Sequence, residues 1–520
     1  MRLQLFFWGT TMAFTCLLLS ACQWSSNRKN SNDPALIQGQ ALAAKYCQSC
    51  HVLPDPNWVD ATTWEKGILP MMGPRLGIFS HQGKRYKVNK YEVSITGDFY
   101  PTQPLLTEIE WQKIIDYYVR LAPEKPLPQN RSIAIGNNLK QFEVLATNFK
   151  DKLPATSYVK IDTANHSTPF VITDALNHFM YRFDAQLNLV DSFKTKGPIV
   201  NRLASRNNWL LCDIGILNPD NGANGSIKSI TLNQAGGFPK EGEKTLLDRL
   251  QRPVQFESVD LNADGRQDLL VCEFGYLTGA LNWYENKKEG GYEKHSLRAK
   301  PGAIKAVIQD YNHDGLPDIW VLFAQGEEGI YLYTNLGKGK FKEDPILRFP
   351  PINGSSYFEL ADFNKDGFDD IIYTCGDNAD YSLVLKAFHG VYVYLNDGKN
   401  NFTQKYFYPL NGCYKAIARD FDKDGDLDLA TISYFADFEH QPEEGFVYLE
   451  NKGNYNFTPT SASLTQKGRW LTMDAGDYNQ DGYLDLILGN FSVAPSFIPS
   501  KIDWKKGPPF IVLKNRGASK

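Results

Sequence analysis

The sequence has almost no net charge, which excludes one broad class of function. Its 520 residues include 55 Lys and Arg against 59 Asp and Glu, a formal net charge of −4 at pH 7. Without an excess of either sign, we expect no basic face for a nucleic acid and no global field that steers a charged partner. Function must therefore be sought in local motifs.

The common catalytic signatures are also missing. The chain has only eight histidines, and we find no Ser-His-Asp spacing, no nucleotide-binding loop and no His-rich metal centre. Long amphipathic helical stretches are scarce, whereas aromatic residues make up 13% of the chain. This composition is typical of short strands joined by turns. A chain of this length needs two domains or a toroidal repeat fold, and we predict that most of it is β structure.

An apolar run near the N-terminus is too short for a comfortable membrane span. It extends from Leu5 to Leu19 and ends in the tetrapeptide Leu19-Ser20-Ala21-Cys22. The tetrapeptide resembles the bacterial lipobox, which implies cleavage before Cys22 and lipidation of that residue; an ordinary signal peptide is the alternative. A polar, Ser/Asn-rich tether follows. We therefore predict an exported protein, lipid-anchored on the periplasmic side of a bacterial membrane or at the cell surface.

The most specific short motif is Cys47-Gln48-Ser49-Cys50-His51. Two thiols three residues apart can both add to the vinyl groups of one haem, and the adjacent imidazole can then bind its iron. A zinc site would need a second ligand pair, and a thioredoxin-like site would need a preceding strand. Since neither is present, the motif predicts covalent haem c held by Cys47, Cys50 and His51.

Two predicted helices flank this motif. Asp33 as N-cap and Pro34 at the first helical position begin one helix, while Thr107 and Glu110 form a capping box that begins the other. The arrangement resembles the class I cytochrome c family, whose first and last helices pack together beside the haem. Gly39 stands where that family has a Gly at the helix crossing. The resemblance implies a small all-α domain for electron transfer.

The sixth iron ligand is predicted in a Pro/Gly-rich loop. Met71 and Met72 are the only methionines between the motif and the second helix. We prefer Met72 because Gly73 frees the backbone to approach the porphyrin, with Met71 and then His81 as alternatives. The spacing from His51 to Met72 is shorter than in most of the family, so a five-coordinate iron stays open.

From residue 256 onward, one nonapeptide frame occurs five times. Side-chain oxygens stand at positions one, three, five and nine, a Gly at six permits a sharp turn, and the carbonyl of position seven completes a ligand set for calcium. The predicted ligands are Asp260, Asn262, Asp264, Arg266 and Asp268; Asp310, Asn312, Asp314, Leu316 and Asp318; Asp362, Asn364, Asp366, Phe368 and Asp370; Asp420, Asp422, Asp424, Asp426 and Asp428; and Asp477, Asn479, Asp481, Tyr483 and Asp485.

These frames are not EF-hands. None has Glu at position twelve, and each is followed by a β-rich run such as Leu269-Leu270-Val271, whereas an EF-hand needs that Glu and a helix on either side. A metal-free Asp/Asn/Gly turn is the alternative for any single copy. Five copies in register argue against it as a general explanation.

Each frame is followed by a strand that ends in Asn and a Gly turn, as in 331–337 and 393–398. One repeat therefore amounts to four short strands, which is typical of a propeller blade. The pattern resembles FG-GAP/VCBS-type repeats, as in integrin heads, and this implies calcium loops between the first two strands of each blade, clustered on one face. Weaker strand pairs before residue 256 add two blades, giving seven. We predict that Phe142–Leu145 supplies the outer strand missing after Phe510–Leu513.

The remaining cysteines allow two interpretations. Cys212 with Cys272, and Cys375 with Cys413, would bridge neighbouring blades in an oxidising compartment. Buried free thiols are the equal alternative.

The predicted fold class is mainly β, a seven-bladed β-propeller preceded by a small all-α cytochrome c domain. The predicted segments are a signal peptide 1–21, a tether 22–33, a haem domain 34–125, a linker 126–140 and an FG-GAP/VCBS propeller 141–520.

The leading functional hypothesis is single-electron transfer, with a propeller that docks a redox partner protein or a small ligand. A dehydrogenase that passes electrons to its own haem is one alternative, but an electron carrier is favoured over a catalytic oxidoreductase. The other is an adhesion or glycan-binding module, in which Trp283-Tyr284 and Tyr434-Phe435 would stack on sugars. The partners expected are this protein or ligand and, through the lipid, a membrane, with no nucleic acid.

Overall fold

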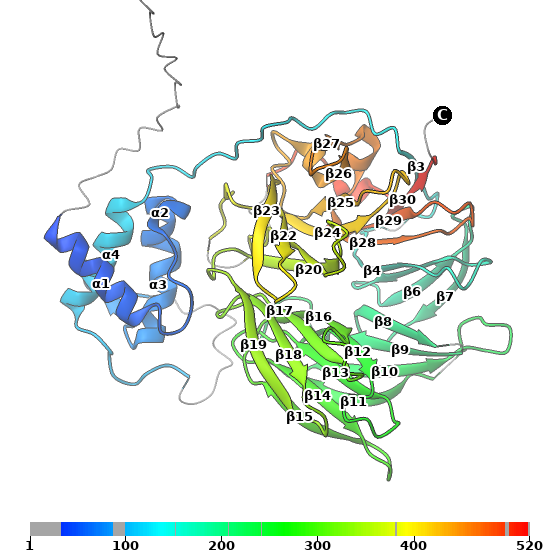
Figure 1. The fold of residues 1–520 in the computed structure, drawn as a ribbon, viewed down its shortest axis with the longest axis horizontal. Coiled ribbons are helices and arrows are strands. Elements are labelled where there is room, and N and C mark those ends of the chain that lie inside the picture. Colours follow the sequence, from blue (N-terminus) through cyan, green and yellow to red (C-terminus); the bar gives the residue numbers. More distant parts are fainter. Residues whose placement is uncertain are drawn as a thin grey trace, which may run out of the picture.

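A small helical unit stands beside a ring of sheets (Figure 1). The computed structural model describes residues 33–86, 99–150, 152–205, 207–240, 242–379, 382–493 and 499–517. The predicted signal peptide, the predicted tether up to residue 32 and the predicted lipidation site Cys22 lie outside these residues. Within the described ranges, no helix combines the length and the apolar character needed to span a membrane.

The helical unit contains the two flanking helices where the sequence predicts them. Its elements are α1 (Pro34–Tyr46), η1 (Pro56–Trp58), α2 (Ala61–Thr63), η2 (Trp64–Ile68), α3 (Leu69–Met72), η3 (Gly73–Leu76), β1 (Ser80–His81), β2 (Lys84–Arg85) and α4 (Glu108–Leu121). Asp33 caps α1 by accepting the Ala35 amide at 2.9 Å, and the capping box of Thr107 and Glu110 caps α4. Local sequence therefore sets both helix starts.

Helices α1 and α4 cross at Gly39. A Cβ atom placed there would lie 2.3 Å from the carbonyl oxygen of Lys113 and 2.8 Å from Cβ of Tyr117. Only glycine permits so close a backbone approach. The crossing predicted at Gly39 is confirmed, and the core beside it is formed by fully buried side chains such as Trp64 and Trp111.

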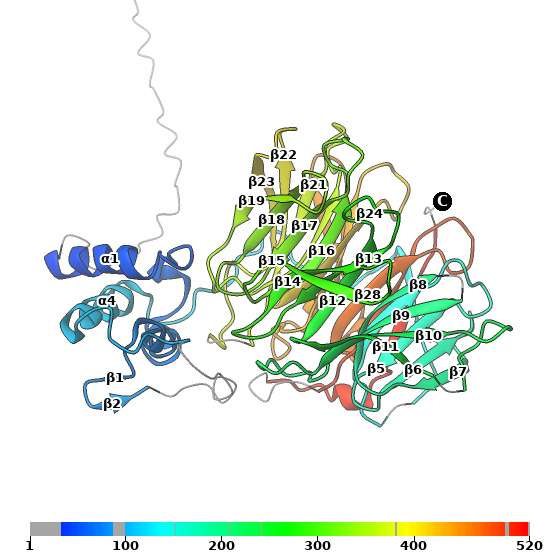
Figure 2. The same ribbon diagram turned by 90° about the horizontal axis from the view of Figure 1, so that it is seen from below.

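The ring is a seven-bladed β-propeller whose blades are four-stranded antiparallel sheets (Figures 1 and 2). The first three blades are β4 (Thr156–Ile161), β5 (Phe170–Asp174), β6 (Phe179–Phe183) and β7 (Leu189–Lys194); β8 (Ile199–Ser205), β9 (Asn208–Asp213), β10 (Gly225–Thr231) and β11 (Lys244–Leu250); and β12 (Pro253–Val259), β13 (Asp268–Glu273), β14 (Ala280–Asn286) and β15 (Tyr292–Arg298). The two blades expected before residue 256 are thus present.

The next three blades carry the second, third and fourth loop frames. They are β16 (Ala303–Gln309), β17 (Asp318–Phe323), β18 (Gly329–Asn335) and β19 (Phe341–Arg348); β20 (Ser355–Ala361), β21 (Asp370–Cys375), β22 (Gly390–Asn396) and β23 (Phe402–Pro409); and β24 (Cys413–Arg419), β25 (Asp428–Ser433), β26 (Phe446–Asn451) and β27 (Phe457–Thr460). Short 3-10 turns η4 (Pro442–Gly445), η5 (Ser463–Lys467) and η6 (Trp504–Lys506) stand in the connections of the last two blades.

The seventh blade closes the ring with strands from both ends of the propeller. It consists of β28 (Trp470–Gly476), β29 (Asp485–Asn490), β30 (Phe510–Asn515) and β3 (Phe142–Ala146). Val144 on β3 pairs with Leu513 on β30. The prediction that this N-terminal segment fills the outer place of the last blade is confirmed, and the ring has no open edge between its two ends.

Packing between blades explains the apolar runs. The second strands β13, β17, β21, β25 and β29 are buried at every position. Because each lies between two neighbouring blades, both of its faces need apolar side chains. The inner strands are less buried, as in β16, where only Ala303 and Ala306 are buried and the other five residues are half-buried.

The linker fixes the helical unit on the propeller. The guanidinium of Arg131 forms an ion pair with the fully buried carboxylate of Glu444, and the side-chain amide of Gln129 donates to the carbonyl of His389 at 2.8 Å. In the helical unit itself, Trp58 contacts Phe388 of the propeller with ring centroids 5.5 Å apart. A buried ion pair and an aromatic contact therefore set the position of one unit against the other.

Removing the aromatic anchor of β3 should weaken the closed ring. Phe142 is 2% exposed and packs edge-on against Phe421 and Tyr448, with ring centroids 5.6 Å and 5.3 Å away. We expect Phe142→Ala to lower the free energy of unfolding by about 3–5 kcal/mol through the cavity it leaves. Urea denaturation measures this change. The exposed neighbour Glu143 is the control, because Glu143→Ala should change stability by less than about 0.5 kcal/mol; equal effects of the two variants would contradict the closure argument.

Candidate metal loops and the Cys-His segment

All five predicted loops connect the first and second strands of their blades and share one backbone conformation. Position four is left-handed in every copy, with φ of 61°, 59°, 62°, 62° and 59° at Ala263, His313, Lys365, Lys423 and Gln480. The glycine at position six has φ between 84° and 100° in every copy, a region that other residues adopt only with strain. The repeated sequence thus folds into a repeated geometry.

Hydrogen bonds turn the predicted ligands toward the inside of each loop. In the first copy, the carboxylate of Asp260 accepts the amides of Asp264 at 3.1 Å and Gly265 at 2.7 Å, and Asn262 accepts the Asp264 amide at 3.2 Å. The equivalent bonds occur in the second, third and fifth copies. Positions one, three and five therefore converge, while carboxylate and amide oxygens keep lone pairs for a further partner.

The fourth loop brings three carboxylates together. One carboxylate oxygen each from Asp420, Asp422 and Asp424 lies within 4.8 Å of the others, and this is the one copy with Asp rather than Asn at position three. Oδ1 of Asp420 is buried and has no hydrogen-bond partner. A buried carboxylate oxygen without a donor is costly unless a cation satisfies it, so the residues of this loop fit a bound divalent ion.

The aspartate at position nine is fully buried in all five loops. Its two oxygens accept backbone amides from separate segments, as in Asp370, which binds the amides of Phe363 at 2.9 Å and Asn396 at 2.8 Å. Burial raises the pKa of all five carboxyls, and to about 7 for Asp428 and Asp485. A nearby cation would favour the charged form of these groups.

The partner of the position-nine aspartate was not recognised from sequence as part of the site. The amide donor is the Asn that ends the third strand in each of the five blades with a loop, namely Asn286, Asn335, Asn396, Asn451 and Asn515. The sequence shows this Asn after each loop, at the end of a predicted strand. Its regular place in the repeat could have suggested a role in the site. The contact between its amide and the aspartate forms only when the blade folds.

Position seven differs between copies. Its amide donates to position five, for example from Leu316 to Asp314 at 2.9 Å, which leaves its carbonyl as the predicted contribution. In the first loop the guanidinium of Arg266 also binds the carboxylate of Asp264. This loop therefore already holds a positive group beside one predicted ligand.

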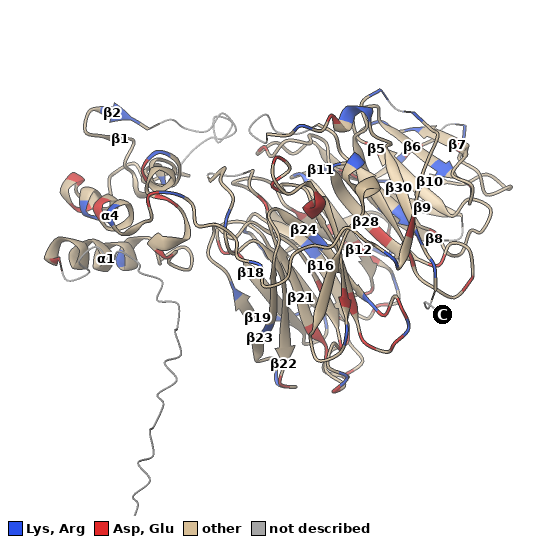
Figure 3. Cartoon of the chain, turned by 90° about the horizontal axis from the view of Figure 1, so that it is seen from above, with Lys and Arg blue, Asp and Glu red and all other residues tan. Residues whose placement is uncertain are grey.

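Neighbouring loops touch each other across the blades. Lys365 of the third loop binds Asp426 of the fourth at 2.8 Å, and Nζ of Lys423 lies 4.2 Å from the ring centroid of Tyr483 in the fifth. These contacts place three consecutive loops side by side on one face of the ring. Over the rest of the molecule, charges of both signs are interspersed (Figure 3), in line with the small net charge.

The Cys-His segment begins where α1 ends. The Cys47 amide donates to the carbonyl of Ala43 at 2.8 Å, and Cys47 and Cys50 are both free thiols, with Cys50 exposed. Burial raises the pKa of Cys47 to about 12 and lowers the pKa of His51. Nδ1 of His51 lies 2.9 Å from the carbonyl oxygen of Val52. A neutral imidazole whose Nδ1 is held by a carbonyl presents Nε2 as its ligand atom.

Zinc is not supported at this segment. In the part of the chain that the structure describes, the ligand atoms of Cys47, Cys50 and His51 do not gather within 4.8 Å of one another. A structural zinc site needs four ligands around one ion. Because the two thiols and the imidazole do not converge on one point, they suit a ligand larger than a single metal ion.

The candidates for the sixth ligand have different surroundings. Met72, at the end of α3, packs against the same core as Cys47. The carbonyl of Met71 accepts Arg75 at 2.7 Å. His81 is engaged elsewhere, with Nε2 2.6 Å from Oε1 of Gln112 on α4. The contacts of these side chains favour Met72 over His81.

Two further sequence interpretations are decided by burial. The aromatic residues considered for sugar stacking are only 4–7% exposed, which leaves too little ring surface for stacking on a sugar, so the structure does not support that interpretation; they are Trp283, Tyr284, Tyr434 and Phe435. The four propeller cysteines are buried free thiols; they are Cys212, Cys272, Cys375 and Cys413. The bridging alternative is therefore not realised.

Comparison with known families identifies the repeats. The FG-GAP-like repeat profile matches residues 260–321 and 310–373, which span the first three loop frames. The protein therefore carries FG-GAP-like repeats in a seven-bladed β-propeller. One curated relative is the T-cell immunomodulatory protein homolog of Plasmodium falciparum (isolate 3D7), 26% identical over 215 residues. The match covers 33% of this chain and only 28% of that protein.

Solved structures show weaker similarity. The N-terminal domain of Nup159 is 10% identical with a TM-score of 0.42, covering 74% of this chain and 99% of that one. The Neurospora crassa Pan2 WD40 domain is 11% identical with a TM-score of 0.43, covering 73% and 97%. Because both TM-scores lie below 0.5, these similarities support no statement about this protein.

The metal-free protein should be more stable at mildly acidic than at mildly alkaline pH through its position-nine aspartates. Burial raises the pKa of Asp428 from its ordinary value of 3.8 to about 7 in the folded state. The folded state therefore binds the proton more tightly, and its stabilisation grows as pH falls through about 7 towards 4. In chelator, Asp428→Asn should flatten the dependence of the melting temperature on pH between 5.5 and 8.5. Asp397→Asn, at an exposed turn, should keep the wild-type slope; a wild-type slope in Asp428→Asn would contradict the assignment.

Proposed function

We propose that this protein is an extracytoplasmic, lipid-anchored c-type cytochrome that transfers single electrons, with a calcium-binding FG-GAP propeller that docks a redox partner or a ligand. The observation that carries the proposal is the Cys47–His51 segment at the end of α1, in a unit whose first and last helices cross at Gly39. The FG-GAP-like repeats and the closed propeller are compatible with a docking module.

The residues of the helical unit suit a covalent haem. Haem supplies one-electron redox chemistry when bound. Cys47 and Cys50 would hold it through thioether bonds, and His51 would offer Nε2 to its iron, oriented by the Val52 carbonyl. Met72 is the proposed sixth ligand. The apolar core beneath these residues would keep water away and limit reorganisation during electron exchange.

Calcium is the proposed occupant of the five loops. Each loop would supply the side chains of positions one, three, five and nine and the carbonyl of position seven. The unpaired Oδ1 of Asp420 supports a cation in the fourth loop. A cation would also offset the neighbouring carboxylates that, together with burial, raise the pKa of Asp428 and Asp485. The ions would stiffen one face of the ring, because each joins the loop to the second strand of its blade.

The lipid anchor and the export of the protein rest on the tetrapeptide that ends at Cys22. This segment lies outside the described residues. FG-GAP repeats are typically extracellular, which agrees with export.

The docking proposal depends on the fixed position of the helical unit on the propeller. The Arg131 and Glu444 ion pair and the contact of Trp58 with Phe388 hold the helical unit against the propeller. A partner bound to the propeller would therefore meet the haem unit at a fixed distance. Electron transfer between them would not need a search by a mobile domain.

Removing calcium should destabilise the propeller. A ligand that binds only the folded state stabilises it according to its free concentration, so a chelator should lower the melting temperature, and excess calcium should restore it. The drop should be larger at pH 8 than at pH 6, because protons compete for carboxyls with a pKa of about 7. Calorimetry at both pH values measures this. Magnesium serves as the control ion, and an unchanged melting temperature in chelator would disprove the calcium assignment.

The purified protein should be coloured and contain one covalent haem. We expect a haem c spectrum that survives acid-acetone extraction, and its loss when Cys47 and Cys50 are both replaced by Ala. Met72→Ala should keep the haem but lower its reduction potential, because thioether ligation favours the reduced iron. Met71→Ala is the matched control with an unchanged potential. A colourless protein expressed with a haem maturation system would refute the cytochrome.

A further inference from the structure

A cluster of ionisable side chains outside the sites above lies on the outer half of the third blade. Glu285 on β14 pairs directly with Glu293 on β15, and His295 follows two residues later. Side chains two apart on a strand share one face of the sheet. One ligand atom from each of the three residues lies within 4.8 Å of the others.

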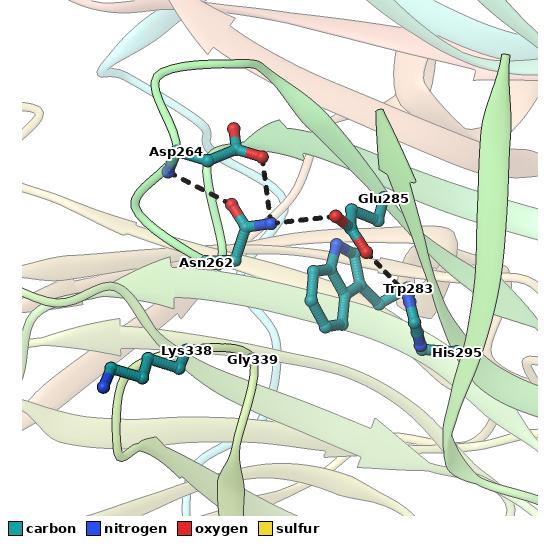
Figure 4. Close-up of a pocket in the computed structure, with 7 residues that line it drawn as sticks. All are labelled: Asn262, Asp264, Trp283, Glu285, His295, Lys338 and Gly339. Carbon is teal, nitrogen blue, oxygen red and sulfur yellow. Dashed lines mark hydrogen bonds and ion pairs between the residues drawn. The ribbon is translucent and has the colours of Figure 1, made fainter. Parts of the chain in front are cut away.

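Two members of this cluster, Glu285 and His295, line a cavity of about 370 Å³ between two blades. Asn262 and Asp264 of the first loop line one side, and Lys338 and Gly339 of the next blade line another. Figure 4 shows His295 and Glu285 side by side at this cavity, with Asn262 reaching Glu285 from the loop. The cluster is therefore open to a ligand.

Contacts on both sides hold the donors in place. The ring of His295 lies over Trp283 with centroids 4.5 Å apart, and its Nε2 is 2.9 Å from Oε2 of Glu285. The amide of Asn262 donates to the other oxygen of Glu285 at 3.3 Å. An imidazole and a carboxylate thus converge in a geometry that needs little rearrangement.

The electrostatics of the cluster require a positive charge. Two carboxylates that face each other across strands repel, and Nζ of Lys287 lies between them, 3.0 Å from Glu285 and 2.8 Å from Glu293. The side chain of Lys287 is 36% exposed, so its flexible stem can turn toward solvent. The ammonium group of Lys287 therefore occupies the position that a metal ion would take, and it can move away when the ion binds.

We propose that Glu285, Glu293 and His295 form a binding site for Zn²⁺, with Lys287 as a built-in competitor. One imidazole nitrogen and two carboxylate oxygens form a donor set that suits zinc, whereas calcium takes oxygen ligands. Three protein ligands leave a fourth position for water or a small ligand from the adjacent cavity. The site is separate from the five calcium loops in its ligand set, but Asn262 connects it to the first of them.

The experiment measures zinc binding by the full-length holoprotein in excess calcium, which keeps the five loops occupied. Isothermal titration and metal analysis after dialysis give the affinity and the number of bound ions. We expect His295→Gln and Glu293→Gln each to lose one zinc ion per chain relative to wild type. Lys287→Met should bind that ion at least tenfold more tightly, because it removes the competing ammonium group.

A matched control is available on the sixth blade. Exposed His440 lies 2.9 Å from half-buried Asp437, and among the described residues no third His, Cys, Asp or Glu joins this pair, so His440→Gln should bind zinc as wild type does. In chelator, all variants should have the melting temperature of the wild-type protein, which shows that a loss of zinc binding is not caused by a loss of folding. Wild-type zinc stoichiometry in His295→Gln, or zinc binding by Lys287→Met no tighter than wild type, would overturn the proposal.

Discussion

The buried aspartate at position nine of each loop is the group on which the propeller's organisation depends. This aspartate is the first residue of the second strand. Its carboxylate accepts one hydrogen bond from a backbone amide at the start of the loop and another from the backbone amide of the Asn that ends the third strand. One carboxylate therefore joins three strands of a blade. Such a group is costly to bury unpaired, so the proposed ion binding would be coupled to blade geometry.

Ring closure and the attachment of the helical unit depend on contacts that are distant in sequence. Strand β3 reaches the last blade across the whole propeller, and Arg131 joins the linker to Glu444 in the sixth blade. Both contacts involve the short stretch between the two units. That stretch therefore closes the ring and attaches the helical unit to the propeller at the same time, which links the proposed electron carrier mechanically to the proposed docking module.

Most of the fold followed from local patterns. The caps of α1 and α4, the Gly39 crossing, the five loops and the seven blades were all predicted, because turns and caps need particular residues at particular positions. Burial could not be predicted in the same way: Trp283 and Tyr434 resembled exposed sugar-binding residues, yet both pack inside blades. The cluster of Glu285, Glu293 and His295 also went unnoticed, because the sequence gives no register between two adjacent strands.

The sequence by itself determined the repeated loops, the helix ends and the spacing of Cys47, Cys50 and His51. These features depend on residues close together in the chain, where backbone sterics and hydrogen-bonding groups act directly. Only the tertiary structure decided that the four propeller cysteines stay free and that Asp420 has an unpaired oxygen. These outcomes depend on which distant surfaces pack together, and packing is determined by the whole core rather than by any one segment.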